Sequence, residues 1–168
     1  IDVTDAAAPL GGTATVSVTA SAGNVAGYEV TVAFDPNNLQ VQSVEGADFD
    51  DPTVNVDNQN GVVTFTQAQG EGADKPTLAQ INFEVLVDAQ TDVTVKSSTS
   101  TLFDADGDSI SSLSYGGGVV EKEEPGDGDV DDDGDVDAGD VVLLQQYIVG
   151  EDVNIDTEAA DVDGDGDI

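Results

Sequence analysis

The sequence predicts a mainly β fold, a β-sandwich or jelly roll, with a small helical module towards its C-terminal end. Apolar and polar residues alternate with a period of two through most of the first 122 residues, as they do in strands buried on one face. Clusters of Gly, Pro, Asn and Asp separate these alternating stretches. Helical periodicity first appears near residue 140.

The alternating stretches amount to roughly nine short strands, which is typical of a sandwich or jelly roll. The clearest of them cover residues 14–20, 28–34, 39–41, 54–56, 63–65, 81–87 and 93–95. The turns expected between them cover residues 9–12, 21–23, 35–38, 57–61, 70–72 and 104–108.

The composition is strongly acidic. The net charge is −33, and the only cations among the side chains are three lysines. Half of the 36 acidic residues lie before residue 123 and half from residue 123 onwards, where there is no basic residue. Such a surface repels phosphate groups and anionic lipids, so nucleic acid is not an expected partner.

Two interpretations of this acidity compete. One is a disordered acidic chain, but 38% hydrophobic residues and regular strand periodicity argue against it. The other is a surface adapted to high salt, as in a haloarchaeal-like organism, where dense carboxylates retain water and ions. We expect the second, with unfolding in low salt and refolding in molar salt as its test.

An acidic segment at residues 129–140, DVDDDGDVDAGD, has the spacing of a twelve-residue calcium loop. In such a loop, side-chain oxygens come from positions 1, 3 and 5, and a glycine turns the chain at 6. A backbone carbonyl serves at 7, position 9 often acts through water, and a carboxylate closes at 12. These positions hold Asp129, Asp131, Asp133, Gly134, Asp135, Asp137 and Asp140, so we predict a Ca²⁺ site.

A solvated acidic linker is the alternative interpretation of this segment, because runs of like charge are usually solvated. The spacing of the other residues favours a metal site over a linker. Val136 at loop position 8 would anchor the loop on a small core, and a helix follows at once. The helix is expected over residues 140–149, ending at Gly150. Its expected apolar stripe consists of Val141, Leu143, Leu144, Tyr147 and Ile148.

Residues 123–128, EEPGDG, are expected to link a domain at residues 1–122 to a calcium-binding module at residues 129–168. Pro125 and the glycines at 126 and 128 exclude the helix that enters a conventional EF-hand loop. The first loop is therefore followed by a helix but not preceded by one.

A second, incomplete copy of the loop occupies the end of the sequence. Asp161, Asp163, Asp165 and Asp167 fall at positions 1, 3, 5 and 7, whereas position 9, the closing position 12 and a second helix are missing. Either the sequence stops short of the loop's end, or another part of the chain or a neighbour supplies the missing ligands. Between the two copies, residues 157–160 could form one helical turn with Thr157 as its cap.

Calcium sites of modest affinity suit an extracellular or cell-surface protein, where the ion is plentiful. The sequence begins at Ile1 rather than Met, which fits a processed secreted protein or a fragment. No segment resembles a signal peptide or a membrane span, and the absence of cysteine leaves the redox compartment open.

Asp104, Asp106 and Asp108 resemble the start of another calcium loop. The glycine precedes the third aspartate instead of following it, and Tyr115 stands where the closing carboxylate belongs, so we expect a polar turn. We do not expect an enzyme, because the chain has no histidine or cysteine and a pair of carboxylates arises by chance among so many acids.

Sugar binding is a further alternative, because jelly rolls often bind carbohydrate. It generally needs exposed aromatic platforms, and the sequence has no tryptophan. Four of its aromatic residues fall in apolar strand positions and are expected in the core: Tyr28, Phe34, Phe65 and Phe83.

Residues 1–121 resemble a cohesin module. The resemblance rests on residues 27–39, GYEVTVAFDPNNL, and continues in order at residues 41–46, 56–61, 78–85, 104–110 and 117–120. It implies a nine-stranded jelly roll in which one sheet face receives a dockerin.

The acidic tail resembles a dockerin, because it duplicates the calcium loop and lacks the entering helix. The resemblance implies partner contacts at loop positions 10 and 11 and on the later face of the helix: Ala138, Gly139, Gln145 and Gln146. Many dockerins carry hydroxyl and basic residues there, whereas these four are small or neutral. In strong salt, packing and neutral hydrogen bonds would have to carry such an interface.

The two resemblances together imply a calcium-dependent assembly module. A dockerin that fits the cohesin of another copy makes a head-to-tail contact, which propagates into a filament unless it closes a ring. We expect this self-association, in an extracellular filament or surface assembly. An adaptor for other cohesin- or dockerin-bearing proteins and an intramolecular clasp stay open as alternatives.

Overall fold

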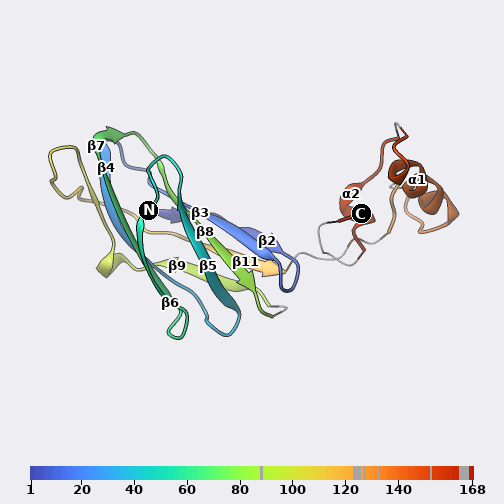
Figure 1. The fold of residues 1–168 in the computed structure, drawn as a ribbon, viewed down its shortest axis with the longest axis horizontal. Coiled ribbons are helices and arrows are strands. Elements are labelled where there is room, and N and C mark those ends of the chain that lie inside the picture. The colour runs from blue at the N-terminus through green and yellow to red at the C-terminus, as the bar shows by residue number, and fades with distance from the viewer. Residues whose placement is uncertain (88, 123–125, 127, 132, 152, 163–166) are drawn as a thin grey trace. The chain divides into compact units, whose positions relative to one another are not determined.

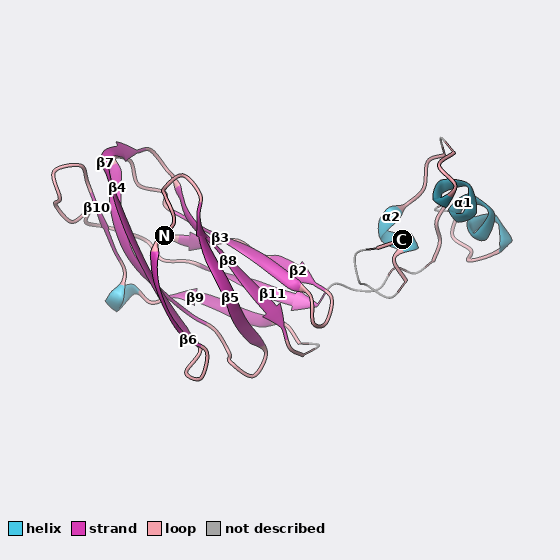
Figure 2. Cartoon of the chain, in the orientation of Figure 1, coloured by secondary structure: helices cyan, strands magenta, loops and turns pink. Residues whose placement is uncertain are grey.

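The computed structural model describes residues 1–87, 89–122, 126, 128–131, 133–151, 153–162 and 167–168. The chain divides into two compact units, Ile1–Lys122 and Glu123–Ile168. The first unit is built of strands and the second carries the α-helices (Figures 1 and 2).

The first unit is a sandwich of two mainly antiparallel sheets. The smaller sheet has the order β1-β3-β8-β5 and comprises β1 (Asp2–Val3), β3 (Thr13–Thr19), β8 (Thr77–Val85) and β5 (Leu39–Gly46). The larger sheet has the order β2-β11-β9-β4-β7-β6, and β10 also pairs with β4. Its strands are β2 (Ala6–Ala8), β11 (Gly117–Lys122), β9 (Thr91–Val95), β4 (Val25–Ala33), β7 (Val62–Ala73), β6 (Thr53–Asp57) and β10 (Thr101–Phe103).

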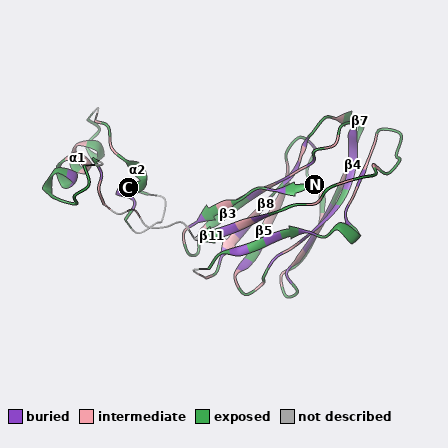
Figure 3. Cartoon of the chain, turned by 180° about the vertical axis from the view of Figure 1, so that it is seen from behind, coloured by how far each residue is buried: buried purple, intermediate pink, exposed green. Residues whose placement is uncertain are grey.

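The core lies between the two sheets and is filled by the inward residues of the alternating strands (Figure 3). Tyr28 stacks edge-on against Phe49 and Phe65, with ring centroids 5.1 and 5.9 Å away. Its hydroxyl donates to the carbonyl oxygen of Leu78 at 3.0 Å, so its one polar group is satisfied inside the core. Phe34 and Phe83 form a second edge-on pair at 5.2 Å.

The predicted sandwich and the four aromatic core positions are confirmed, whereas four strands, β1, β2, β10 and β11, were not among the stretches predicted from alternation. β1, β2 and β10 contain only two or three residues each, too few to display an alternating pattern. One predicted turn was wrong, because residues 70–72 lie inside β7. A Cβ on Gly72 would come within 2.1 Å of the Asn24 side chain, so glycine serves there for close strand approach.

The second unit contains α1 (Ala138–Ile148) and α2 (Thr157–Ala160). The predicted helix is confirmed but begins two residues earlier than expected, because Asp137 caps it and forms a capping box with Asp140. α1 ends at Ile148 and is followed by the cap residue Val149 and by Gly150, whose φ of +84° is the left-handed conformation that favours glycine. The predicted turn at residues 157–160 is also helical, but Asp156 rather than Thr157 caps it.

Among the described residues, no helix has both the length and the apolar character needed to cross a membrane.

Candidate metal centre and contact helix

The first half of the loop at residues 129–140 is shaped by its own carboxylates. Asp129 accepts the backbone N–H of Asp133 at 3.1 Å through one oxygen and that of Gly134 at 2.9 Å through the other. Gly134 has a φ of +94°, the conformation that the sharp turn at loop position 6 requires. Asp133 accepts the N–H of Asp135 at 3.0 Å, which continues the turn.

Three aspartates converge inside this turn. One carboxylate oxygen each from Asp129, Asp131 and Asp133 lies within 4.8 Å of the other two. Desolvation raises the pKa of Asp131 above its usual value, and the negative charges of Asp133, Asp140 and Asp129 raise it further. A divalent cation would relieve this repulsion, and hard oxygen ligands are those that Ca²⁺ prefers. The donor set at loop positions 1, 3 and 5 therefore fits calcium.

The closing residue, Asp140, is 4% exposed and binds the start of the loop through backbone groups. One of its oxygens accepts the N–H of Val130 at 2.7 Å and that of Asp131 at 3.3 Å. The other accepts the N–H of Asp137 at 2.7 Å. The bond from Asp137 is the main cause that lowers the pKa of Asp140, and the bonds from Val130 and Asp131 add to it. Asp140 thus holds both ends of the loop together as an anion.

The two remaining predicted ligands are exposed. Asp135 stands at position 7, where a backbone carbonyl serves the metal, so its side chain is not required as a ligand. Asp137 stands at position 9 and accepts the N–H of Gly139 at 2.6 Å as the cap of α1. A water bound to the metal could still bridge to it, as is common at this position.

Val136 was predicted as the apolar anchor of the loop, and this prediction was wrong: its side chain is 66% exposed. The anchor is Val130 at loop position 2, which is 3% exposed. Its carbonyl oxygen accepts the N–H of Asp156 at 2.9 Å, and this bond holds the start of the loop beside α2. Ala159 and Ala160 of α2 are the other buried apolar residues described in this unit.

Two glycines of the expected linker take part in the second unit. Gly126 donates to the carbonyl oxygen of Asp161 at 2.7 Å, and Gly128 donates to that of Ala159 at 2.9 Å. A Cβ on Gly126 would lie 2.3 Å from the carbonyl oxygen of Glu158, so no other residue fits without a shift. The start and the end of this unit are therefore bound to each other.

The second loop copy is described only in part. Asp161 is 8% exposed and Asp167 is exposed, whereas Asp163 and Asp165 lie outside the described residues. The structure therefore gives no geometry for a second metal site.

The four residues expected to contact a partner lie on α1. Ala138, Gly139 and Gln145 are exposed, and Gln146 is half-buried. Residues seven apart lie on one face of a helix, so Ala138 and Gln145 form one row and Gly139 and Gln146 the next. Val142 and Val149 continue the first row and are 52% and 74% exposed. We call Ala138, Val142, Gln145 and Val149 the α1 strip.

The two valines of the α1 strip were not predicted as contact residues. Only their spacing in the sequence could have identified them, since Val142 follows Ala138 by four positions and Val149 follows it by eleven. The apolar stripe predicted for this helix is not buried as expected, because Val141 and Ile148 are 55% and 62% exposed. Leu143 and Leu144 are half-buried, so the helix presents most of its apolar residues to solvent.

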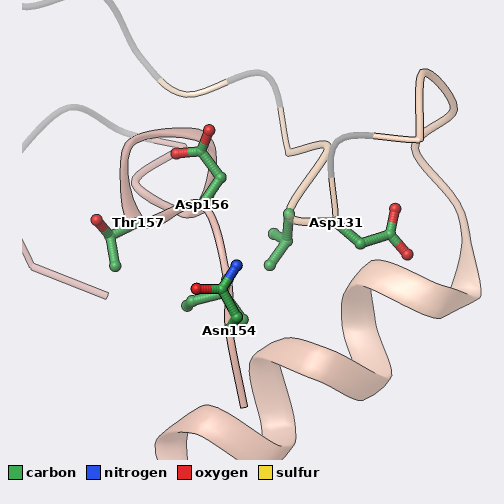
Figure 4. A pocket seen from close by; sticks show the side chains of 6 residues that line it. Asp131, Asn154, Asp156 and Thr157 are labelled. Atoms are coloured by element: carbon green, nitrogen blue, oxygen red, sulfur yellow. The ribbon is translucent and has the colours of Figure 1, made fainter.

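A shallow hollow beside the metal centre is lined by Val130, Asp131, Asn154, Ile155, Asp156 and Thr157. The carboxylates of Asp131 and Asp156 point away from each other rather than into a common centre (Figure 4). Asp156 caps α2 by accepting the N–H groups of Glu158 and Ala159. This hollow is therefore not a second place where the described carboxylates converge.

The polar turn expected at residues 104–108 is confirmed. Asp104 accepts the N–H groups of Asp106 and Asp108 at 3.0 and 2.9 Å. Gly107 has a φ of +84°, which places the chain in a tight turn.

Comparison with known proteins agrees with the two units. The family model for the cohesin domain matches residues 1–118, and that for the dockerin type I domain matches residues 127–168. No curated protein matches the chain.

Several solved structures share the fold of the first unit. The sixth cohesin of scaffoldin B from Acetivibrio cellulolyticus, solved with a dockerin, is 15% identical, with a TM-score of 0.61 over 73% of this chain and 96% of that one. A type I cohesin–dockerin complex from Clostridium thermocellum gives 13% identity and a TM-score of 0.62 over 73% and 96%. A non-cellulosomal cohesin from the archaeon Archaeoglobus fulgidus gives 18% identity and a TM-score of 0.57 over 73% and 91%.

Cohesin and dockerin domains are non-catalytic modules that mediate protein–protein assembly, and the type I dockerin is a calcium-binding module. The three convergent aspartates lie within the part of the chain that the dockerin model matches. The chain belongs to the cohesin family and carries a type I dockerin domain behind its cohesin domain.

Proposed function

We propose that this protein assembles head-to-tail with copies of itself, the dockerin of one copy binding the cohesin of the next, in a contact that depends on calcium. The observation that supports this most directly is the presence of both partners of a binding pair on one chain. The contact is heterologous, so it propagates into a filament unless its rotation closes a ring.

The surface proposed to receive the dockerin is the outward face of β4, β7 and β6. Because Tyr28, Val30 and Val32 of β4 face the core, the alternate residues of these strands lie on the opposite face, where Thr31 is itself only 5% exposed. The pairing aligns them in rows, Glu29 with Thr66 and Thr53, Thr31 with Thr64 and Asn55, and Ala33 with Val62 and Asp57. We call these nine residues the threonine face.

The middle row of the threonine face, Thr31, Thr64 and Asn55, is uncharged in a unit whose net charge is −15. Only Glu29 and Asp57 are acidic, and Thr31 and Thr64 bond to each other through their hydroxyls at 3.1 Å. The dockerin match at residues 127–168 has 16 acidic residues and no basic one, so it must dock where opposing negative charge is low. The neutral α1 strip matches this face in polarity, which lets packing and hydrogen bonds carry the contact.

The outward face of the smaller sheet is less suitable. Glu84 and Glu45 lie on it, and its polar side chains are already paired with one another. Gln42 donates to Glu84 at 2.6 Å, and Asn82 both accepts from Thr15 at 2.6 Å and donates to Ser43 at 2.9 Å. Docking there would break satisfied bonds and bring acids close to acids.

Lys96 places a positive charge at the edge of the threonine face. Its backbone N–H donates to the carbonyl oxygen of Thr31 at 2.8 Å, which places it beside the centre of the face, and its side chain is exposed. It is one of only three lysines in the chain. A cation at this edge would steer the acidic dockerin of another copy towards the neutral surface.

Calcium supplies the stability that the dockerin's small core lacks. Val130 and the two alanines of α2 bury little apolar area, so metal binding must supply much of the folding free energy of this unit. The ion would be held by Asp129, Asp131 and Asp133, with Asp140 closing the loop, Asp135 serving through its carbonyl and Asp137 through water. The second loop, with Asp161, Asp163, Asp165 and Asp167, would hold a second ion if its missing ligands are supplied.

The test is to substitute Asp129 and Asp140 together with alanine and to measure association in calcium by sedimentation. We expect the association to be lost while the sandwich keeps its strand signal in circular dichroism. The matched control substitutes Asp104 and Asp106, two turn aspartates of the first unit, and should associate normally. Unchanged association in the loop variant would overturn the calcium-dependent mechanism.

The acidic surface and the calcium requirement together suit a salt-adapted, extracellular or cell-surface assembly. An adaptor that binds other cohesin- or dockerin-bearing proteins is the second candidate. It is favoured if the full chain stays monomeric in calcium yet captures a foreign cohesin or dockerin.

A further inference from the structure

The larger sheet of the first unit ends in an open edge at β6. This strand is the last in the order of its sheet and pairs with β7 on one side. Four of its five residues are exposed and the fifth is half-buried. An edge strand presents unpaired backbone N–H and C=O groups, which can pair with a strand of another molecule. The edge of β6 is therefore a candidate contact surface.

The hydrogen bonds of β4 show which backbone groups of β6 face this edge. The N–H and the carbonyl oxygen of Thr31 bond to residues on the side away from β7. Because these directions alternate along a strand, Thr64, which lies opposite Thr31, directs its backbone groups towards β6, where it pairs with Asn55. Val54 and Val56, on either side of Asn55, therefore direct theirs to the open edge. No hydrogen bond to another described residue occupies these outer groups.

The side chains of the same two valines lie on the inner side of the larger sheet without being fully covered. Val54 pairs with Phe65 and Val56 pairs with Val63, and both of these β7 residues are buried in the core. Val54 is half-buried against the core, whereas Val56 is 41% exposed. The edge thus combines free backbone groups with apolar side chains that a pairing strand would cover.

Other edge strands in the described part of the sandwich are closed or short. In β5, the side-chain amide of Asn58 accepts the N–H of Val41 at 2.9 Å and donates to its carbonyl oxygen at 3.0 Å. In β10, the carbonyl oxygen of Leu102 accepts the N–H of Ile110 at 2.8 Å. β1 and β2 have two and three residues. Proteins commonly close their edges in these ways to prevent uncontrolled pairing, so an open edge at β6 indicates a use.

We propose that β6 pairs antiparallel with β6 of a second copy, about a two-fold axis at Asn55. In this register Val54 of each copy lies opposite Val56 of the other, and each of these pairs exchanges two backbone hydrogen bonds. The valines of both copies meet on the inner side of the joined sheet and cover one another. The contact uses the same surface on both copies, so it closes with two of them.

Charge does not oppose this pairing at its centre. Asn55 faces Asn55 across the axis, and Asp57 lies opposite Thr53 of the second copy. The two Asp57 residues are four positions apart along the strands, which is about 14 Å. Molar salt screens charges at this distance, and it screens the repulsion between two units of net charge −15. Pro52 has no N–H to donate, so the ladder does not extend beyond β6 in that direction.

This contact is separate from the calcium-dependent one, because it uses a strand edge of the first unit and needs no metal. It is also weak, since one short strand from each copy buries much less than the roughly 1,000 Å² expected of a stable interface. Pairing is therefore expected at about millimolar protein concentration. At micromolar concentrations the chain in chelator keeps the mass of a monomer.

Disulfide trapping tests the register directly, because the chain has no cysteine of its own. Asn55→Cys in the full chain places two thiols at directly opposed positions, where the Cα atoms are about 4.5 Å apart and a disulfide can form. Thr53→Cys is the matched control, since it is exposed on the same side of the same strand but lies about 14 Å from its counterpart. Both variants would be oxidised near millimolar concentration, in molar salt with excess chelator.

We expect at least ten times more covalent dimer from Asn55→Cys than from Thr53→Cys. A mixture of Thr53→Cys with Asp57→Cys should form mixed dimers, because these two positions lie opposite each other. Adding Val56→Asp to Asn55→Cys should lower the yield to that of the control, since it places an acid against Val54 of the second copy. Equal yields from the Asn55 and Thr53 variants would indicate random collision and overturn the proposal. No dimer from any of them would also overturn it and leave the edge to a strand of a different protein.

Discussion

The carboxylate of Asp140 and the backbone N–H of Val130 are joined by a 2.7 Å hydrogen bond that closes the acidic loop on itself. Asp140, which is expected to close the metal site, thus also binds Val130. Val130 is the one buried apolar residue among the described residues of the loop. This bond couples calcium binding to the packing of the second unit, because both depend on one carboxylate.

Replacing Asp140 with alanine should remove the helical structure that the second unit retains without calcium. The N–H groups of Val130, Asp131 and Asp137 would lose their acceptor, and α1 would lose half of its capping box. Helical circular dichroism in chelator should fall relative to wild type. Asp135→Ala removes the same charge from an exposed position and should leave the signal unchanged; an equal loss in both variants would refute this role of Asp140.

Gly126→Ala should disrupt the second unit because the added Cβ clashes with backbone atoms. The added Cβ would lie 2.3 and 2.4 Å from the carbonyl oxygens of Glu158 and Ala159, and both are backbone atoms that cannot rotate away. We expect calcium affinity and association to fall together, measured by calorimetry and sedimentation. Gly70→Ala, where the Cβ meets nothing within 4 Å, is the matched control. Wild-type behaviour of the Gly126 variant would mean that the linker does not bind the second unit.

Lys96→Glu should weaken association by about tenfold at the lowest salt in which the sandwich stays folded, since it replaces an attractive charge with a repulsive one. The loss should shrink as salt rises, because ions screen an exposed charge. Lys75→Glu makes the same charge change in an exposed turn next to β8 and should have a smaller effect. Binding constants of the two variants would be measured by sedimentation. An equal loss of affinity in both would contradict the threonine face as the docking surface.

The Tyr28 hydroxyl should make the stability of the sandwich fall at high pH. Burial raises the pKa of Tyr28 to about 12, whereas an unfolded tyrosine ionises near pH 10. Because the folded state holds this proton more tightly, the stability that it contributes is present below pH 10 and is lost as the pH rises towards 12. Chemical denaturation at a series of pH values measures this decline.

Tyr28→Phe should lower the free energy of unfolding at neutral pH by about 1–3 kcal/mol, since the carbonyl oxygen of Leu78 stays buried without its donor. It should also flatten the decline between pH 10 and 12. Tyr147→Phe, on the exposed side of α1, should leave both the stability of the sandwich and its decline at high pH unchanged. An unaltered pH profile in the Tyr28 variant would show that another group causes the decline.

The sequence predicted most of the sandwich because period-two alternation records directly which side of a strand is buried. Tyr28, Phe65 and Phe83 were placed in the core from this pattern alone, and all three are at most 1% exposed. The short strands β1 and β10 were missed because their pairing depends on partners distant in sequence, such as Asp2 with Thr19 and Leu102 with Tyr28.

The loop at residues 129–140 shows what could not be predicted from the sequence. Ligand spacing identified the three convergent aspartates, but Val136 was chosen as the apolar anchor by analogy with position 8. Which apolar residue is buried depends on tertiary packing, and here it is Val130, whose carbonyl oxygen accepts the N–H of Asp156. The roles of Gly126 and Gly128 were missed for the same reason, since their partners Asp161 and Ala159 are more than 30 positions away.

The central claim is that calcium drives this chain to assemble with itself, and particle mass tests it most directly. Light scattering would be recorded on the full chain in molar salt, first with calcium, then with excess chelator, and again after calcium is restored. We predict a mass that grows with protein concentration in calcium, falls to that of a monomer in chelator and recovers. A monomer mass in calcium at every concentration would contradict self-assembly and leave the two domains as modules for other proteins.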